Sequence, residues 1–324
     1  MFFGTQLVLQ DLPEGLSSRS RSDYSKSFKL WRIFCDQFRI SLTAPSQPNL
    51  LRFAAWQFRR PTNSGSRISS HITGILSTLK THAISVDRRA FTALTQLLKG
   101  YNKRRPPKTR PGRPITRFVL QSWLTHDHGT SFNDKVIKVA VQVAYAHCLR
   151  VGEYTFTNAK KRHGDRRLNW QHVKIIRKNG TQYLEIKIPK SKTNQIAAQP
   201  QRTISACQCQ HGFCALHAVQ QYRADYTKFV GPIRPHNAFL VWNSGKTLTE
   251  RHINAQVNTW CDTNPSPFNS SEFFAHGYRS GRCTDLFRKG IRNLIIEKVG
   301  RWKSDAWEKF YMKLELEELT NLNF

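Results

Sequence analysis

The stretch that decides the fold class is Trp170–Lys192, which reads WQHVKIIRKNGTQYLEIKIPKSK. Its apolar and polar residues alternate on both sides of Asn179-Gly180, and an Asn-Gly pair between two such runs is a strong signal for a two-residue hairpin turn. The stretch therefore predicts two antiparallel strands. A third strand is expected at 199–205, QPQRTIS.

The sequence around the hairpin has helical spacing of its apolar residues. On the N-terminal side, one helix is expected over 117–127 and one long apolar helix over 134–156, DKVIKVAVQVAYAHCLRVGEYTF. On the C-terminal side, helices are expected at 214–226, 249–261, 277–290, 292–300 and 304–319. The predicted fold class is mainly α with a small antiparallel β-sheet, so this part of the chain is an α+β domain.

The first hundred residues predict a separate helical bundle. Amphipathic helices are expected over 20–38, 48–60, 66–85 and 88–100, the last of them closed by Gly100. The segment YNKRRPPKTRPGRPIT, 101–116, holds four prolines and cannot continue a helix. We therefore predict a helical domain at 1–100, a basic Pro-rich linker at 101–116, and a second domain at 117–324.

The chain is strongly basic, with 51 Lys and Arg against 21 Asp and Glu, a formal net charge of +30. Such an excess indicates a polyanionic partner, and double-stranded DNA is the leading candidate. A membrane surface is the weaker alternative because the sequence offers neither a basic amphipathic helix nor a lipidation signal. Its most apolar run, 136–151, is interrupted by polar residues and is too short to cross a bilayer.

The cysteine content indicates a reduced, intracellular compartment. Seven is an odd number, most of the cysteines lie far apart in sequence, and the N-terminus is a poor signal peptide. The basic linker can lie along phosphates, or it can be a solvated run of the nuclear-localisation type. Its candidate DNA contacts are Lys103, Arg104, Arg105, Lys108, Arg110 and Arg113.

Two short motifs hold residues suited to phosphoryl chemistry. Arg150 is followed three residues later by Glu153, whose carboxylate would orient the guanidinium if the helix continues. FFAHGYRSGRC, 273–283, places His276 and Arg279 on one helical turn. Two arginines can neutralise the oxygens of one phosphate, and a histidine beside them can move a proton. Each residue also has a structural alternative: a helix-end charge for Arg150 and a buried core residue for His276.

Further candidates follow in GRWKSDAWEKFY, 300–311. Tyr311 is a possible nucleophile if neighbouring cations assist its phenol, and Trp302 can donate its indole N–H to a phosphate or simply pack. A hairpin lysine is suited to protonate a leaving 5′-hydroxyl, and the location admits Lys187, Lys190 and Lys192.

The order of these residues resembles the tyrosine recombinase (phage integrase) family: R-x-x-E, a hairpin lysine, H-x-x-R, then a Trp nine residues before a Tyr. The resemblance extends over about the last two hundred residues. The run GRWKSDAWEKFY is most similar to the Crypton and DIRS-like recombinases of eukaryotic mobile elements. HGYR departs from the commoner H-x-L-R by placing Tyr278 in the leucine position, which affects packing more than chemistry.

The resemblance implies a helical core-binding domain, a catalytic domain, and a DNA strand exchange without metal, ATP or cofactor. It implies a tetramer in synapsis and, in a eukaryote, a nuclear location. The implied catalytic residues are Arg150, Lys192, His276, Arg279, Trp302 and Tyr311, with Glu153 in support and Lys190 in reserve.

Three other functions remain open from the sequence. A type IB topoisomerase uses similar residues without a synapsed partner, although the short chain favours the recombinase. A catalytically silent DNA-binding protein of the same fold is possible, although the set of catalytic residue types is intact. An RNA-binding or packaging protein would use only the charge and would leave the ordered motifs unexplained.

A second cluster, CQCQHGFCALHAV, gathers zinc-ligand residue types. Its spacing matches no standard zinc motif, so the sequence favours buried thiols, with a structural zinc as the alternative. The cluster comprises Cys207, Cys209, His211, Cys214 and His217.

Overall fold

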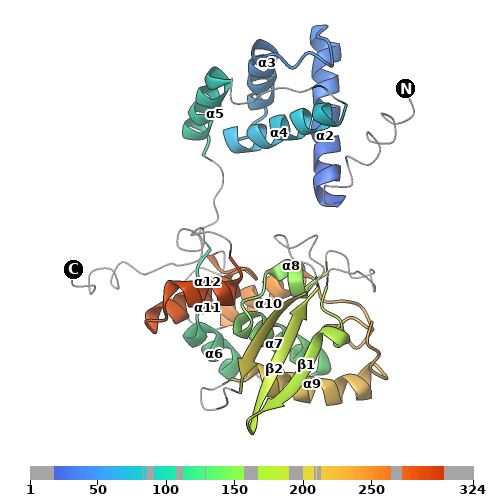
Figure 1. The fold of residues 1–324 in the computed structure, drawn as a ribbon, viewed down its shortest axis with the longest axis vertical. Helices are drawn as coiled ribbons and strands as arrows, with labels where there is room; N and C mark the ends of the chain where they lie inside the picture. The colour runs from blue at the N-terminus through green and yellow to red at the C-terminus, as the bar shows by residue number, and fades with distance from the viewer. Residues whose placement is uncertain are drawn as a thin grey trace, which may run out of the picture. The chain divides into compact units, whose positions relative to one another are not determined.

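The computed structural model describes residues 18–82, 84, 91–106, 112–127, 129–156, 167–189, 200–207, 209, 213–263 and 272–302. The chain divides into two compact units, Met1–Thr109 and Arg110–Phe324 (Figure 1). Each unit buries its own hydrophobic core. Within the described ranges, no helix combines the length and apolar character that crossing a membrane requires.

The first unit is a helical bundle, as the sequence predicts. Trp31, Phe34 and Phe53 meet in its core with ring centroids 5.4–5.5 Å apart. Serines begin two helices: Ser46 Oγ accepts from a backbone N–H at 3.5 Å and Ser64 Oγ from another at 3.3 Å, which satisfies donors that a helix start leaves open. The helices are α2 (Ser18–Phe38), α3 (Gln47–Phe58), α4 (Gly65–Thr81) and α5 (Thr92–Arg104).

Helix α5 does not end at Gly100, so that expectation is wrong. The helix continues to Arg104, and Tyr101 is buried with its ring stacked 3.8 Å from that of Phe58. The next residue outside the helix, Arg105, lies 4.2 Å above the Phe58 ring and donates to three backbone carbonyls of 58–63 at 2.7–3.0 Å. Packing of these side chains extends the helix through a glycine that sequence propensity treats as a stop.

The second unit places a three-stranded antiparallel sheet, ordered β1-β2-β3, against helices (Figure 1). Leu184, Ile186 and Ile188 of β2 are buried in the core that α7 and α9 also line. The elements are α6 (Arg117–His126), α7 (Phe132–Ala146), α8 (Val151–Tyr154), the 3₁₀ turn η3 (Trp170–His172), β1 (Val173–Lys178), β2 (Thr181–Ile188), β3 (Gln201–Ala206), α9 (Ala215–Phe229), α10 (Glu250–Thr263), α11 (Gly277–Arg288) and α12 (Asn293–Gly300).

The hairpin forms where the sequence predicts it. Val173 pairs with Ile186, and Lys178 pairs with Thr181 across the two-residue turn. Asn179 and Gly180 have φ angles of 49° and 77°, the left-handed conformation that this turn needs. The predicted third strand is also present, paired antiparallel with β2.

The long apolar helix predicted over 134–156 is wrong in one respect, because it is interrupted. Helix α7 begins with a capping box between Ser131 and Asp134 and ends at Ala146. Cys148 then takes a left-handed φ of 52°, and Arg150 is extended before α8 starts. The break exposes backbone carbonyls at the C-terminal end of α7, and the candidate site is built on them.

The segment 112–117 fixes the position of α11. Arg113 N–H donates to the Glu272 carbonyl at 2.8 Å, and Ile115 N–H donates to the Gly277 carbonyl at 2.9 Å. Arg117 N–H donates to a carboxylate oxygen of Asp285 on α11 at 2.6 Å. These contacts hold the helix whose first turn includes the HGYR motif.

Candidate active site

Arg150 and Glu153 pair at the start of α8. Glu153 Oε2 accepts the backbone N–H of Arg150 at 2.8 Å, and Oε1 lies 3.0 Å from Arg150 Nη1. The carboxylate is buried, with 3% of the residue exposed. It therefore orients the guanidinium as the R-x-x-E spacing suggested, but as the third residue of a new helix rather than on a continued face of α7.

Arg279 reaches the same place from α11. It has no exposed surface, and its guanidinium donates to the Cys148 carbonyl at 2.8 Å and to the Gly300 carbonyl. The Trp302 ring covers it, with 4.5 Å between the guanidinium carbon and the ring centroid. Burial lowers the pKa of Arg279 to about 10, with Arg150 acting in the same direction, so it remains charged at neutral pH.

A third arginine, Arg301, joins the group and was not identified from the sequence. Its Nη2 lies 2.7 Å from Glu153 Oε2, and its guanidinium donates to the carbonyls of His147 at 3.1 Å and Cys148 at 3.2 Å. Burial lowers its pKa, although the Glu153 carboxylate opposes the shift. Arg301 follows Gly300 at the end of α12, in the left-handed conformation with φ of 58°.

Gly300 allows this arrangement because Trp302 folds back onto it. A Cβ atom at position 300 would lie 1.5 Å from the Trp302 ring, far inside contact distance. Trp302 also packs against the small cluster of Cys283, Leu286 and Ile296. Of the two roles open from the sequence, the described geometry places the indole in packing over Arg279.

His276 precedes α11 and part of its surface is exposed, but neighbouring protein atoms, including the arginines, exclude much of the water around its ring. Desolvation of the ring, followed by the charges of Arg279 and Arg150, lowers the pKa of His276 to about 4, while Glu153 acts in the opposite direction. The imidazole is therefore neutral at pH 7 and can accept a proton.

A buried histidine connects the arginine group to the sheet. His147 Nδ1 hydrogen-bonds with Thr203 Oγ1 at 2.9 Å, and Nε2 hydrogen-bonds with Ser205 Oγ at 3.0 Å, both on β3. Its backbone carbonyl accepts from Arg301. Burial lowers the pKa of His147 to about 3, so it is a neutral bridge between β3 and the end of α7.

The structure thus brings together Arg150, Glu153, His276, Arg279 and Trp302. The nucleophile candidate Tyr311 and two of the three lysine candidates, Lys190 and Lys192, lie outside the described residues. The third, Lys187, lies on β2 opposite Arg202 of β3.

Of the basic residues in the expected linker, some are exposed and others bind groups of the protein itself. Lys103 and Arg104 are exposed on the last turn of α5. Arg105 binds carbonyls of its own unit, and Arg113 pairs with the Glu272 carboxylate at 2.8 Å. Lys108 and Arg110 lie outside the described ranges.

The Cys/His cluster is not a set of buried thiols, so that interpretation is wrong for two members. Cys207 and Cys209 are exposed, whereas Cys214 is buried as the N-cap of α9. His217, one turn into α9, is exposed. His211 lies outside the described residues.

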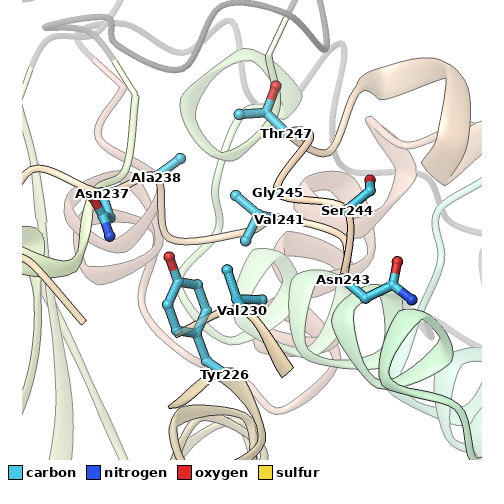
Figure 2. A pocket seen from close by; sticks show the side chains of 9 residues that line it. All are labelled: Tyr226, Val230, Asn237, Ala238, Val241, Asn243, Ser244, Gly245 and Thr247. Atoms are coloured by element: carbon cyan, nitrogen blue, oxygen red, sulfur yellow. The ribbon is translucent and has the colours of Figure 1, made fainter. Parts of the chain in front are cut away.

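A surface hollow of about 390 Å³ lies between the end of α9 and the turn at 237–247 (Figure 2). Its lining combines Tyr226, Val230 and short polar side chains such as Asn237 and Asn243. Among the described residues, none of the candidate catalytic side chains lines it. The candidate active site is therefore the arginine group and not this hollow.

The comparisons with known proteins agree with this fold. No protein-family model and no curated protein sequence matches the chain. Among solved structures, the site-specific recombinase XerH in a post-cleavage complex with difH substrate matches with a TM-score of 0.59 at 12% identity, covering 92% of this chain and 75% of that one.

Two other structures extend the comparison. The Tn1549 transposon integrase in complex with transposon right-end DNA matches with a TM-score of 0.59 at 14% identity, covering 97% of both chains. A lambda integrase dimer bound to a COC′ core site matches with a TM-score of 0.55 at 12% identity, covering 93% of this chain and 94% of that one. These neighbours are tyrosine recombinases and integrases, and this chain has their fold.

Proposed function

We propose that this chain is a site-specific DNA recombinase or integrase that cleaves and rejoins double-stranded DNA through a 3′-phosphotyrosyl intermediate. The observation that carries the proposal is the meeting of Arg150, Arg279 and His276 around the buried Glu153. The shared fold with recombinases and integrases solved on DNA supports it.

In this proposal, Arg150 and Arg279 bind the two non-bridging oxygens of the scissile phosphate. Planar guanidinium groups match these oxygens with paired hydrogen bonds, and they stabilise the charge that grows in the pentacoordinate transition state. Glu153 and Arg301 position the clamp and do not touch the substrate. Because arginines supply the positive charge that metal ions supply elsewhere, the chemical step needs no metal ion.

The strand cleavage balances as a single phosphoryl transfer. The Tyr311 phenol oxygen attacks phosphorus, the bond to the 5′ oxygen breaks, and a phosphotyrosyl ester forms at the 3′ end. His276 accepts the phenol proton, and Lys192 (with Lys190 in reserve) supplies the proton for the leaving 5′-hydroxyl. A 5′-hydroxyl from another strand reverses these steps, and the retained ester means that no ATP is required.

Access to Arg279 requires a movement, because its guanidinium has no exposed surface. The groups that cover it include the Gly300 carbonyl and the Trp302 ring. We propose that binding of the phosphate moves the Gly300 carbonyl and the Trp302 ring off Arg279, while Arg301 keeps its ion pair with Glu153. A phosphate oxygen then replaces the carbonyl, so the site becomes competent only on DNA.

The wider setting follows from the same proposal. The run GRWKSDAWEKFY resembles Crypton and DIRS-type recombinases, which suggests a role in moving a mobile element, acting in the nucleus of a eukaryotic host and as a tetramer in synapsis. Exposed Lys103 and Arg104 are proposed phosphate contacts.

A covalent-trapping assay tests the proposed function. Nicked duplexes with a randomised region are incubated with the chain, with and without EDTA, and run on a denaturing gel. We expect an adduct with the wild type and with the control Tyr183→Phe, and none with Tyr311→Phe. Sequencing the trapped DNA would then give the cleavage site.

Each of the other possible results of this assay points to a different explanation. An adduct that survives Tyr311→Phe rejects the nucleophile. Tight binding without any adduct, even on a preassembled four-way junction, favours a catalytically silent DNA-binding protein. Rapid relaxation of supercoiled plasmid without a preferred site favours a topoisomerase.

A further inference from the structure

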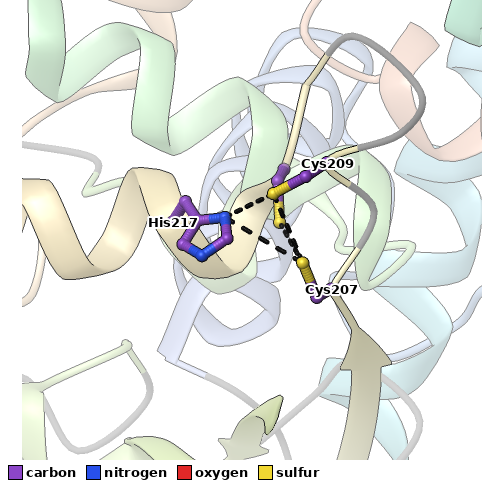
Figure 3. A group of neighbouring side chains, drawn as sticks. Cys207, Cys209 and His217 are labelled. Carbon is purple, nitrogen blue, oxygen red and sulfur yellow. Dashed lines mark hydrogen bonds between the residues drawn. The ribbon is translucent and has the colours of Figure 1, made fainter. Parts of the chain in front are cut away.

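We propose that Cys207, Cys209, Cys214 and His217 bind a structural zinc ion that joins the end of β3 to the start of α9. The four residues lie in one short segment, 207–217, that runs from the end of β3 into the first turn of α9. Cys207 directly follows β3, Cys214 caps α9, and His217 lies one turn into that helix. Figure 3 shows Cys207, Cys209 and the His217 ring turned toward one another.

The ligand atoms already have the spacing of a coordination shell. All four lie within 4.8 Å of one another. The Sγ atoms of Cys207 and Cys209 are 3.3 Å apart, those of Cys207 and Cys214 are 3.8 Å apart, and Cys207 Sγ is 3.9 Å from His217 Nδ1. Tetrahedral zinc with bonds of about 2.3 Å to sulfur separates its sulfur ligands by roughly 3.8 Å. An ion would move the closest pairs slightly apart, including Cys209 Sγ and His217 Nδ1 at 2.5 Å, and would draw together the widest pairs, which are at most 4.8 Å apart.

The chemistry of the ligands selects zinc over harder cations. Thiolate and imidazole are the donors that zinc prefers, whereas magnesium and calcium require oxygen ligands. On binding, three thiols release their protons and the neutral imidazole binds through Nδ1, so the site has a formal charge of −1. Four protein ligands fill a tetrahedron and leave no position for a substrate, which makes the ion structural.

A disulfide is the competing fate of these thiols. In the described chain no cysteine pair is bonded, although Cys207 and Cys209 are exposed to oxidants. A disulfide would use only two of the three sulfur atoms. It would not explain why the third sulfur and His217 Nδ1 lie close to the same point. The geometry of four convergent ligands favours the ion.

The ion would support the candidate active site indirectly, through β3. Cys207 lies two residues beyond Ser205, whose hydroxyl hydrogen-bonds with His147, and the His147 carbonyl accepts from Arg301. A metal that anchors the end of β3 to α9 would therefore hold the strand that supports the arginine group. The metal proposal itself does not depend on the proposed DNA chemistry.

The first test is the zinc content of the whole chain, purified with a non-thiol reductant and measured by plasma mass spectrometry. We expect about one zinc per chain in the wild type. Cys209→Ser and His217→Gln should each lose most of the metal, because each removes one exposed ligand. The controls Cys35→Ala, Cys261→Ala and His236→Gln change the same residue types elsewhere and should retain it.

A second test needs no variant and so is independent of folding defects. X-ray absorption of the zinc-bound wild type should fit three sulfur atoms at about 2.3 Å and one nitrogen at about 2.0–2.1 Å. After replacement by cobalt(II), the visible spectrum should show the intense bands of a tetrahedral thiolate site.

Specific results would overturn the proposal. Wild-type chain without zinc that also fails to take up added zinc or cobalt contradicts it. Metal retained equally by the ligand variants and the controls contradicts the ligand set. Loss of two titratable thiols in the absence of metal would assign the cluster to a disulfide. Because none of these readouts uses DNA, they stand whether or not Tyr311 forms an adduct.

Discussion

Arg301 Nη2 lies 2.7 Å from Glu153 Oε2, and both side chains are buried. The same carboxylate binds Arg150. Glu153 therefore holds two arginines: Arg150, which is proposed to contact the phosphate, and Arg301, which is not. Glu153 therefore couples the integrity of the fold to the orientation of the phosphate clamp.

Removing Arg301 should destabilise the second unit. Breaking a buried pair costs about 3–5 kcal/mol of unfolding free energy when the remaining charge is left uncompensated. In Arg301→Ala the Glu153 carboxylate keeps Arg150, so we expect a loss of about 1–3 kcal/mol. The control Arg288→Ala removes a looser pair with Asp285, at 3.9 Å and with Arg288 about a third exposed, and should cost less than about 1 kcal/mol. Urea unfolding of both variants measures the difference. Equal costs would contradict a structural role for the Arg301–Glu153 pair.

Replacing Gly300 should disturb the cover of Arg279. Gly300→Ala places a methyl group inside the Trp302 ring, so the ring must leave the guanidinium. We expect a lower unfolding temperature and altered DNA cleavage.

The matched control for Gly300 is Gly100→Ala in α5, where no described atom lies within 4 Å of the added methyl. An alanine inside a helix should raise stability by roughly 0.5–1 kcal/mol. A stabilising effect at both positions would refute the close contact at Gly300.

Arg279→Ala and Arg279→Lys should separate cleavage from binding. Loss of one guanidinium aimed at the transition state costs about 10²–10³ in rate, and lysine cannot restore the paired geometry. Affinity for DNA should fall much less, because the chain has 51 Lys and Arg residues and many others remain available to contact phosphate. Adduct formation and gel shifts measure the two effects. A similar loss in both would mean that Arg279 acts mainly in binding or folding.

Stability should fall as the solution is acidified below pH 6.5. Burial lowers the pKa of His147 to about 3 in the folded chain, whereas an unfolded histidine titrates near 6.5. The unfolded state therefore binds more protons between these values, and the free energy of unfolding falls by about 1.4 kcal/mol per pH unit from this residue. His276, with its pKa lowered to about 4, acts in the same direction above that pH.

The test compares unfolding at pH 7.0, 6.0 and 5.5 for the wild type, His147→Gln and the exposed control His126→Gln. His147→Gln should show a smaller slope with pH, whatever its stability at pH 7. An unchanged slope would place the protonation elsewhere.

We expect Lys103 to contribute to DNA binding and Arg105 to contribute to the stability of the first unit. Lys103→Ala should weaken DNA binding with little change in unfolding temperature, and it should reduce the slope of log affinity against log salt by about 1. Arg105→Ala should lower the unfolding temperature of the first unit, because three carbonyls and the Phe58 ring lose their partner. The opposite assignment of effects would reject the role of Arg105 inside the bundle.

Much of the fold is encoded locally and was predictable. The Asn179-Gly180 turn, the alternation of the strands and the serine caps all act over a few residues. The Arg150 and His276 motifs were singled out because their order resembles that of the tyrosine recombinases, and the structure adds how Glu153 holds Arg150.

The features that were missed depend on tertiary contacts. The break after α7 needs a left-handed Cys148, whose carbonyl is bound by arginines far along the chain. The role of Arg301 could not be predicted because its partners, the Cys148 carbonyl and the Glu153 carboxylate, lie about 150 residues away in sequence. No local sequence pattern identifies an arginine that pairs with such a distant carboxylate. Likewise, α5 passes Gly100 because Tyr101 packs on Phe58, a contact that helix propensity does not include.

The hydrogen bonds to the Cys148 carbonyl cannot form early in synthesis of the chain, because their donors lie far along the sequence. Arg279 and Arg301 bind this carbonyl across 131 and 153 residues of sequence. At about 5–20 residues per second, a ribosome takes roughly 7–30 seconds to make that intervening length. The turn after α7 lacks both guanidinium partners until Arg279 is made, and the arginine group is not complete until Arg301 is made. The proposed cleavage activity is thus withheld from any nascent chain in which residue 301 has not yet left the exit tunnel.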